Sequence, residues 1–260
     1  MPRSELLCTD LASVALAARI GADRIELCAA LEVGGVTPGP GLLAAALETS
    51  RAEADGAPPG LVVLVRPRRG DFVYDAGDFR AALADVESAR AAGASGVATG
   101  VLDADGRVDV ARTRELVDAA RPMPMTFHRA LDRTPDLLAS AETLAEIGVA
   151  RLLTSGGAVS AWEGRAELKR LAAELGGTVE IVAAGGVRGD NAARLITETG
   201  VGAIHGSCGR TLEARDLGPR LGSSKAPPES ERSTLDETSA RAFVAAARTG
   251  GGPAPLDSVR

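Results

Sequence analysis

Histidine is the side chain best suited to acid–base chemistry at neutral pH, and both histidines of this sequence fall within or at the end of short β-prone segments. The only histidines are His128 and His205. Glu26 and Arg66 occupy similar positions in two further segments. A carboxylate, an imidazole and a guanidinium that meet in one pocket shift one another's pKa values and can serve acid–base catalysis. The candidate catalytic residues are therefore Glu26, Arg66 and His128.

Alternation along the strands predicts which of these side chains point the same way. In the segment 24–28, Ile25 and Leu27 suit a face covered by helices, which leaves Glu26 and Cys28 on the other face. The same alternation places both histidines on the inner face. If the strands close into a barrel, these side chains would all lie at the same mouth of it. A buried charge network that only stabilises the barrel would produce the same sequence pattern.

Two glycine-rich segments have the composition of an anion-binding loop. AAGGVRGDN at 183–191 follows one β-prone segment, and HGSCGR at 205–210 ends another. Such loops bind phosphate in many (βα)8 barrels through backbone N–H groups and a helix N-terminus, but tight turns also need glycine for structural reasons. The anion-binding candidates here are Gly185, Gly186, His205, Gly206 and Ser207.

An internal repeat indicates the elements that position these residues. Glycine leads into a β-prone segment in GADRIEL, GASGVAT, GVARLLT and GVGAIHG. Glycine at the end of a helix adopts the left-handed conformation without penalty, so each copy predicts a helix-to-strand turn. Helices are predicted over 11–20, 78–91, 161–175, 191–198 and 236–248. Predicted caps are Asp10, Ser160 (with Glu163 three residues later) and Asp190.

Eight β-prone segments alternate with these helical runs. They span 5–8, 24–28, 61–66, 96–99, 123–128, 151–154, 179–184 and 203–206. This alternation predicts a parallel sheet, and eight is the number of strands that closes into a TIM-type (βα)8 barrel. We predict one α/β domain over 1–260, with a polar, flexible loop at about 222–234 before the last helix. An open, doubly wound sheet is the alternative.

Composition excludes several classes of function. The net charge of −6 is spread along the chain without a basic stripe, so nucleic acid is not expected as a partner. Neither a signal peptide nor an apolar run near 18 residues is evident, and three cysteines are too few for a disulfide framework, which predicts a cytoplasmic protein without a membrane partner. The two lysines, Lys169 and Lys225, lie outside the strands, which argues against a Schiff-base aldolase. No nucleotide cofactor is expected.

Six ordered motifs resemble the CutC family over roughly residues 5–210. The quoted segments are GADRIELCAALEVGGVTPG at 21–39, RPRRGDFVYDAGDF at 66–79, GVLDADGRVD at 100–109, TFHRALD at 126–132, LTSGG at 153–157 and AGGVR at 184–188. The resemblance implies a TIM-type barrel, a cytoplasmic role in copper homeostasis and a homo-oligomer, either a dimer or a tetramer. It also adds Arg68, Asp71, Arg129 and Ser155 to the candidate residues that bind a substrate or anion, and it matches Glu5 to the family's first-strand glutamate.

The resemblance has one departure that concerns copper. The family usually has Glu-x-Cys on its first strand, whereas this chain has Glu5-Leu-Leu-Cys8, so Leu7 stands at the expected cysteine position. An offset of one residue turns the side chain to the opposite face of the sheet. Copper(I) favours soft thiolates, and the candidate ligands are therefore Cys28 with Cys8 or Cys208.

Two functions remain open at this stage. The first is the binding and handling of copper(I). The alternative is a barrel enzyme of the lyase or isomerase type that acts on a small anionic or phosphorylated metabolite, with Glu26 or His128 as the acid or base. A non-catalytic interaction module fits less well, because polar groups that converge inside a barrel mouth suit a small ligand.

Overall fold

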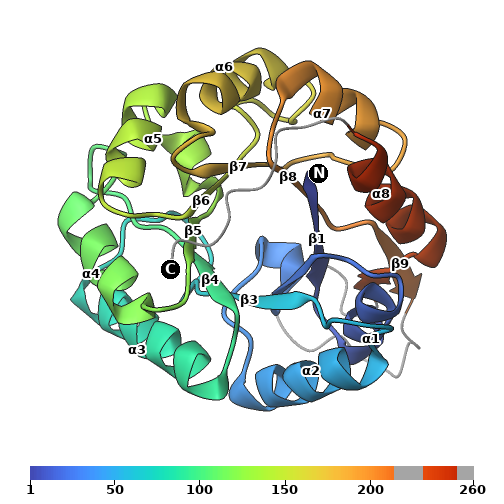
Figure 1. Cartoon of the computed structure of the whole chain (residues 1–260). Coiled ribbons are helices and arrows are strands. Elements are labelled where there is room, and N and C mark those ends of the chain that lie inside the picture. The colour runs from blue at the N-terminus through green and yellow to red at the C-terminus, as the bar shows by residue number, and fades with distance from the viewer. Residues whose placement is uncertain (214–230, 251–260) are drawn as a thin grey trace.

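The computed structural model of the chain describes residues 1–213 and 231–250, and its centre is a closed barrel of eight parallel strands. Figure 1 views the molecule with the strands at the centre and the helices around them. The strands are β1 (Arg3–Cys8), β2 (Arg24–Leu27), β3 (Gly60–Leu64), β4 (Gly96–Thr99), β5 (Met125–Phe127), β6 (Arg151–Thr154), β7 (Glu180–Ala183) and β8 (Ala203–Gly206). The predicted TIM-type barrel is confirmed, and the open sheet is excluded.

A helix follows each strand and covers the outside of the barrel. The α-helices are α1 (Leu11–Arg19), α2 (Pro40–Glu53), α3 (Ala76–Ala92), α4 (Val110–Ala120), α5 (Leu137–Glu146), α6 (Arg165–Leu175), α7 (Ala192–Thr199) and α8 (Glu237–Thr249), and two short 3-10 helices are η1 (Leu31–Val33) and η2 (Arg129–Arg133). Helices α2, α4 and α5 had no predicted bounds, although the alternation required a connection at each place. Within the described ranges, no helix is long and apolar enough to cross a membrane.

The predicted caps had mixed outcomes. Asp10 caps α1 by accepting a hydrogen bond from the Ser13 backbone N–H. The Asp190 prediction is wrong, because Asn191 stands at the cap position of α7 and its side chain bonds the loop instead. The helix predicted from 161 begins only at Arg165.

A turn precedes α6 where the sequence predicted its first residues. Ser160 Oγ accepts from the backbone N–H of Glu163 at 3.3 Å, as a capping serine would, but residues 161–164 form a turn. Gly164 occupies the cap position instead, and a Cβ there would lie 1.9 Å from the Ser155 carbonyl oxygen. Glycine at this position therefore lets the turn pass close to the loop after β6.

Alternation separates an outer and an inner core, as predicted for 24–28. Ile25 and Leu27 belong to the large apolar cluster between strands and helices. Cys28 instead packs inside the barrel with three apolar side chains from β3 and β4. Ile204 likewise faces the helices, so its neighbour His205 faces the interior.

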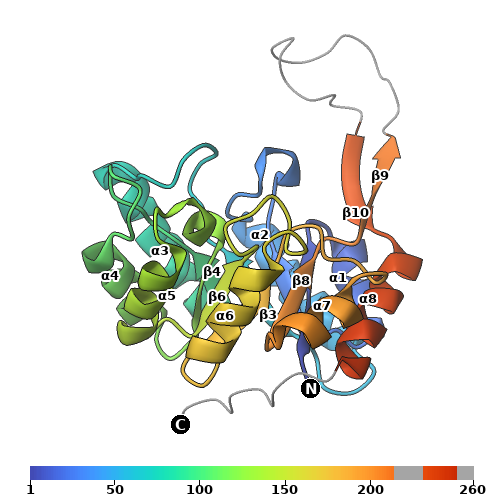
Figure 2. The same cartoon turned by 90° about the horizontal axis from the view of Figure 1, so that it is seen from above.

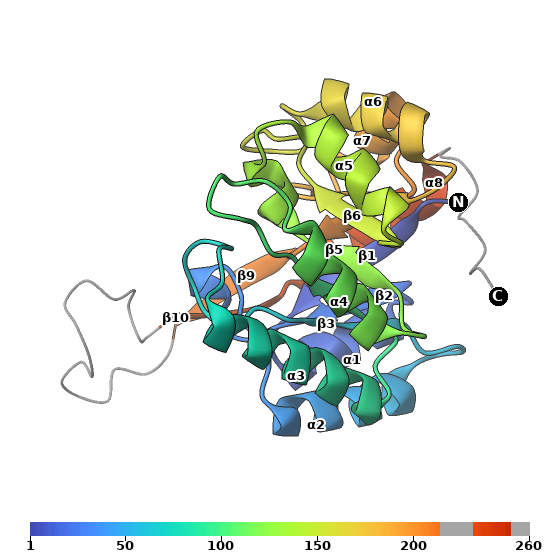
Figure 3. The same ribbon diagram turned by 90° about the vertical axis from the view of Figure 1, so that its left-hand side faces the viewer.

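A β-hairpin that the sequence did not predict follows β8. Strands β9 (Gly209–Glu213) and β10 (Glu231–Leu235) pair antiparallel, and Figures 2 and 3 show them projecting beyond the end of the barrel at which the parallel strands finish. The predicted loop at 222–234 lies mostly outside the described residues, and its last residues are strand rather than loop. The base of the hairpin is fixed on α1, because Ser13 Oγ accepts from the Leu235 backbone N–H.

Candidate functional site

Glu5, His205 and Glu26 form a buried polar cluster across β8, β1 and β2. Strand register produces it, because Glu5 stands opposite His205 on one side and Arg24 on the other. Glu5 Oε1 lies 2.9 Å from His205 Nδ1, and Glu26 Oε2 lies 3.5 Å from His205 Nε2. Glu5 Oε2 accepts from Arg24 Nε at 2.8 Å. One imidazole is therefore held between two carboxylates.

The two carboxylates have opposite pKa shifts. Burial alone would raise the pKa of Glu5, but Arg24 and His205 favour its anion and lower the value to about 2. Among the described residues no arginine forms an ion pair with Glu26, and burial raises the pKa of Glu26 to about 7. Burial acts against the imidazolium of His205, yet Glu26 and Glu5 more than offset it, so the pKa of His205 rises. Glu5 is thus the fixed anion, and a proton can move between His205 and Glu26 near neutral pH.

Further charged groups fill the barrel interior at the amino-terminal ends of the strands. Arg24 Nη1 donates to Glu180 at 2.7 Å, and Arg151 Nε donates to the Thr126 hydroxyl at 2.8 Å. Burial, reinforced by the Arg24 cation, lowers the pKa of Arg151 to about 10. Glycine makes room here, because a Cβ on Gly96 would lie 2.7 Å from Arg151 Nη2. This network holds Arg24 in place, and through it Glu5.

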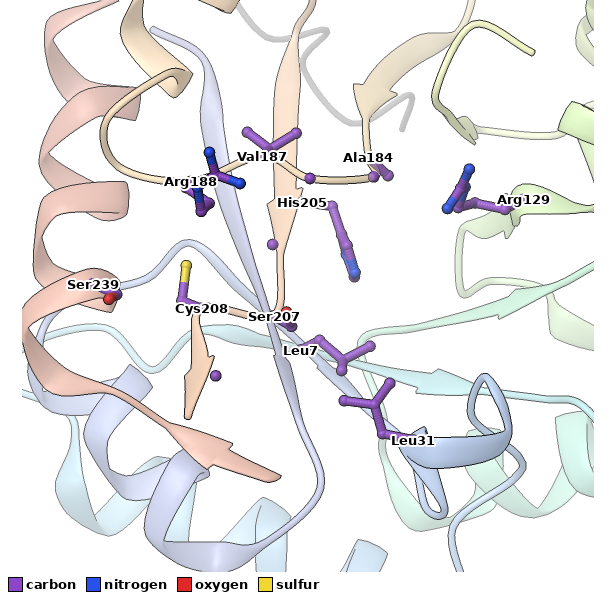
Figure 4. A pocket seen from close by; sticks show the side chains of 14 residues that line it. Leu7, Leu31, Arg129, Ala184, Val187, Arg188, His205, Ser207, Cys208 and Ser239 are labelled. Carbon is purple, nitrogen blue, oxygen red and sulfur yellow. The ribbon is translucent and has the colours of Figure 1, made fainter. Parts of the chain in front are cut away.

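A cavity of about 390 Å³ opens above His205 at the ends of β7 and β8. Its walls include four of the predicted anion-binding residues besides His205: Gly185, Gly186, Gly206 and Ser207. Figure 4 shows Arg188 and Arg129 on opposite sides of the cavity, with the His205 ring between them. Gly185 and Gly186 have φ values of 94° and 68°, which only glycine adopts readily. The cavity is thus walled by turns of backbone and two guanidinium groups.

Arg129 is held at the cavity wall by a buried carboxylate, Asp132. Arg129 Nε lies 2.8 Å from Asp132 Oδ2, and Arg129 Nη2 donates to Ser155 Oγ at 2.9 Å. Asp132 also accepts from the backbone N–H groups of Ser155 and Gly157 and from the Thr154 hydroxyl. This carboxylate therefore fixes both the arginine and the loop after β6.

The arginine also lies close against the loop after β7. A Cβ on Gly185 would meet Arg129 Cζ at 3.4 Å and Ser155 Cβ at 3.3 Å. Glycine at that position lets the guanidinium lie against the turn. Arg129, Ser155 and the loop after β7 consequently form one continuous wall of the cavity.

Arg66, Arg68 and Asp71 do not line this cavity. Arg66 is buried and donates to the carbonyl oxygens of Val33, Gly35 and Gly70, so it ties the loop after β2 to the loop after β3. Arg68 pairs with Asp71 and, at 2.6 Å, with Asp78. These contacts give both arginines a role in shaping the barrel mouth.

His128 lies at the end of β5 with its ring against Phe72, at 4.8 Å between ring centroids. Burial and the nearby Arg66 cation lower its pKa to about 3. His128 is therefore neutral near pH 7 and, unlike His205, has no carboxylate partner among the contacts of the described residues. A histidine of this kind does not exchange protons readily at neutral pH.

The three cysteines do not converge on one point. Cys28 faces the barrel interior, whereas Cys8 belongs to the apolar cluster on the helix side, and Cys208 belongs to that cluster but also lines the cavity. The offset beside Leu7 thus turns Cys8 outward, as the alternation predicted. Burial raises the pKa of Cys28 and of Cys208 to about 12. In the part of the chain that the structure describes, the group with metal-ligand spacing is Glu5, Glu26 and His205, with ligand atoms within 4.8 Å of one another.

Sequence reasoning did not assign roles to Asp132 and Arg188 and gave Glu5 no site role of its own. Asp132 carried a signal, because it lies in the same short segment, TFHRALD, as the predicted Arg129. Glu5 shares the inner face of its strand with Leu7, but its contacts depend on the register of β8 and β2. Arg188 offered no signal beyond its place in the glycine-rich loop.

The fold and site together define a (βα)8 barrel with a cavity at the carboxyl ends of its strands, lined in part by Arg129 and Arg188, and this is the location of the active site in enzymes of this fold. The CutC family model matches residues 3–210, and the chain belongs to the CutC family.

Known proteins of several bacteria are similar to this chain. A CutC family protein of Caulobacter vibrioides is 39% identical over 240 residues, which cover 92% of this chain and 95% of that protein. One of Klebsiella pneumoniae is 43% identical over 208 residues, covering 80% and 81% of the two chains. The crystal structure of a candidate copper homeostasis protein CutC from Streptococcus agalactiae is also similar, with 28% sequence identity and a TM-score of 0.75. The match covers 80% of this chain and 99% of that one.

A more distant structure supports the fold alone. The thiamine phosphate pyrophosphorylase of Pyrococcus furiosus is 17% identical, with a TM-score of 0.56, and covers 96% of this chain and 97% of that one.

Proposed function

We propose that the chain is an enzyme that binds a small phosphorylated or otherwise anionic metabolite in the cavity above His205 and moves a proton on it. The observation that carries this proposal is the position of His205: it lines the cavity, Glu5 fixes its Nδ1 side, and Glu26 faces its Nε2 side. A carboxylate that orients an imidazole is a recurrent arrangement for general acid–base catalysis. Isomerases and lyases of this fold need such a proton carrier.

The remaining cavity walls support an anionic ligand. Backbone turns after β7 and β8 and the side chain of Arg129 surround the space above the imidazole. Guanidinium and backbone N–H groups are the usual partners of phosphate oxygens. The proposed reaction is proton transfer at a carbon of the ligand held beside His205. In it His205 is the proton carrier, and Glu26 accepts the proton from His205 or supplies it. As part of the same proposal, the protein acts in the cytoplasm as a homo-oligomer.

Metal handling is a second candidate, which the Glu5–Glu26–His205 group favours. His205 Nε2 and Glu26 could bind an ion directly, while Glu5 would orient the imidazole through Nδ1. This oxygen and nitrogen set suits a borderline divalent ion better than copper(I), which favours thiolates. Copper(I) would have to recruit Cys28 and turn Cys8 or Cys208 inward, and for that reason we rank the enzyme first.

Replacing Arg129 with alanine is expected to weaken phosphate binding roughly 30-fold, because it removes a charge-assisted hydrogen bond from the cavity wall. Isothermal titration calorimetry with inorganic phosphate measures this change. Arg170→Ala removes an equal charge from the exposed face of α6 and should leave the affinity unchanged.

The enzyme proposal would be contradicted if calorimetry detects no binding of phosphate to the wild-type protein. Stoichiometric copper(I) binding against a competing chelator, lost in Cys28→Ser, would instead support the copper function.

The Asp132→Asn variant is expected to weaken phosphate binding roughly fivefold, because the amide holds Arg129 less firmly than the carboxylate does. In an Arg129→Ala background the same change should have no further effect on phosphate affinity, since Asp132 acts through that arginine. Calorimetry on the four proteins of this double-mutant cycle gives the coupling. Equal losses in both backgrounds would mean that Asp132 acts only on the loop.

A further inference from the structure

His128 has an unusual combination of features for a residue at the barrel mouth. Its ring is buried and its Nδ1 accepts a hydrogen bond from the Ala130 backbone N–H at 3.3 Å. That contact places a lone pair on Nδ1, so the proton of the neutral ring is on Nε2. Nε2 is buried and has no hydrogen-bond partner among the described residues. A buried N–H donor without an acceptor is costly, and such groups are rare without a functional reason.

Neighbouring residues fix the orientation of this donor. A Cβ at Gly100 would lie 2.7 Å from His128 Nδ1 and 2.8 Å from Cε1, so the ring rests directly on that glycine. Phe72 covers the ring at 4.8 Å, and Phe127 lies edge-on to it at 6.2 Å between centroids. The side chain also caps η2. The ring therefore has little freedom to turn Nε2 toward another protein group.

His128 is close in the chain to a residue of the barrel interior, Thr126, and to a residue that lines the cavity, Arg129. Alternation along the end of β5 puts His128 on the same face as Thr126, whose hydroxyl meets Arg151 inside the barrel. The next residue, Arg129, lines the cavity. His128 itself is not among the residues that line the cavity, so a ligand acceptor for Nε2–H would have to extend from the cavity past Arg129 to the end of β5.

We propose that His128 is a fixed, neutral hydrogen-bond donor that binds a carbonyl or carboxylate oxygen of the ligand through Nε2–H. This inference rests on the proposed function, because it assigns the ligand two ends: a phosphate at the loops after β7 and β8, and an oxygen acceptor at the end of β5. It gives His128 a role different from that of His205, which carries the proton. A neutral imidazole that polarises a carbonyl is an established catalytic device.

The protonation of His128 is tested first, by long-range ¹H–¹⁵N NMR of the wild type and of His205→Gln. Only two histidines are present, so the variant assigns both rings. His128 is expected to show the Nε2–H tautomer without titration between pH 5 and pH 8. A ring that titrates in this range, or that carries its proton on Nδ1, would overturn the inference.

The ligand contact is tested with two probes, inorganic phosphate and 2-phosphoglycolate, which adds a carboxylate. Wild-type protein is expected to bind 2-phosphoglycolate at least tenfold more tightly than phosphate. His128→Phe should abolish that preference, which is measured as the ratio of the two affinities of the same variant, and His128→Gln, which keeps an N–H donor, should retain part of it.

Two outcomes separate this inference from the proposed function. If the preference for 2-phosphoglycolate persists in His128→Phe, Nε2–H serves only an internal water, and the inference fails while the cavity remains an anion site. If wild-type protein binds neither probe, the proposed function fails and the ligand role of His128 fails with it.

Discussion

Replacing Glu5 with alanine is expected to lower the free energy of unfolding by about 3–5 kcal/mol, because it removes one of the two carboxylates that pair with the buried Arg24 cation. Glu5 and Arg24 are 2% and 6% exposed at their side chains, and the pair is 2.8 Å apart. The substitution also removes the acceptor at His205 Nδ1. Urea denaturation at pH 7 measures the change.

A surface ion pair with the same nitrogen–oxygen distance provides the control. Arg19 and Glu53 also lie 2.8 Å apart, but their side chains are 51% and 41% exposed. Glu53→Ala should cost less than about 1 kcal/mol, since solvent screens the pair. A similar cost for Glu5→Ala and Glu53→Ala would show that the interior network does not isolate its charges from water.

The second large effect concerns pH. The pKa of Glu26 rises from 4.5 to about 7 on folding, so the folded protein keeps a proton that the unfolded chain releases between these values. Stability should therefore fall as pH rises from about 4.5 to 7, by about 3 kcal/mol in total for this group. His205 acts in the same direction, because its raised pKa adds stability that is lost above 6.5.

Glu26→Gln is expected to flatten this dependence and to be more stable than the wild type at pH 8. The variant removes the pH-dependent stability that the Glu26 carboxylate itself contributes. It also removes the anion that helps to raise the pKa of His205. Glu5 does not interfere, because its pKa of about 2 places its contribution below pH 4.5. Urea denaturation from pH 5 to 8 measures the profiles.

Glu87→Gln, on the exposed face of α3, should leave the wild-type profile unchanged. Parallel wild-type and Glu26→Gln profiles across this range would mean that Glu26 is ionised throughout and does not share a proton with His205.

The positions of the strands and the direction of their side chains were predictable from local patterns in the sequence. Its glycine-led repeat and eight β-prone segments correspond to β1–β8 within a few residues at each end. Alternation alone predicted that Glu26, Cys28 and His205 face inward, because the two-residue period of a strand leaves no other choice once Ile25 and Leu27 face the helices. It also predicted that Cys8 turns outward beside Leu7. These are local properties, readable from neighbours in the chain.

Which inward side chains contact one another was not predictable in this way, because it depends on the closed barrel. Glu5 contacts His205, 200 residues later, because the register of β8 against β1 places them opposite each other. No spacing in the chain encodes that register. Arg66 and Arg68 show the reverse: both were candidate site residues, but nearby carbonyl and carboxylate oxygens accept hydrogen bonds from their guanidinium groups, and Arg129 faces the cavity instead. Residue types define what chemistry is possible, whereas barrel closure decides which groups perform it, since hydrogen bonds and charge interactions act over a few ångströms in space.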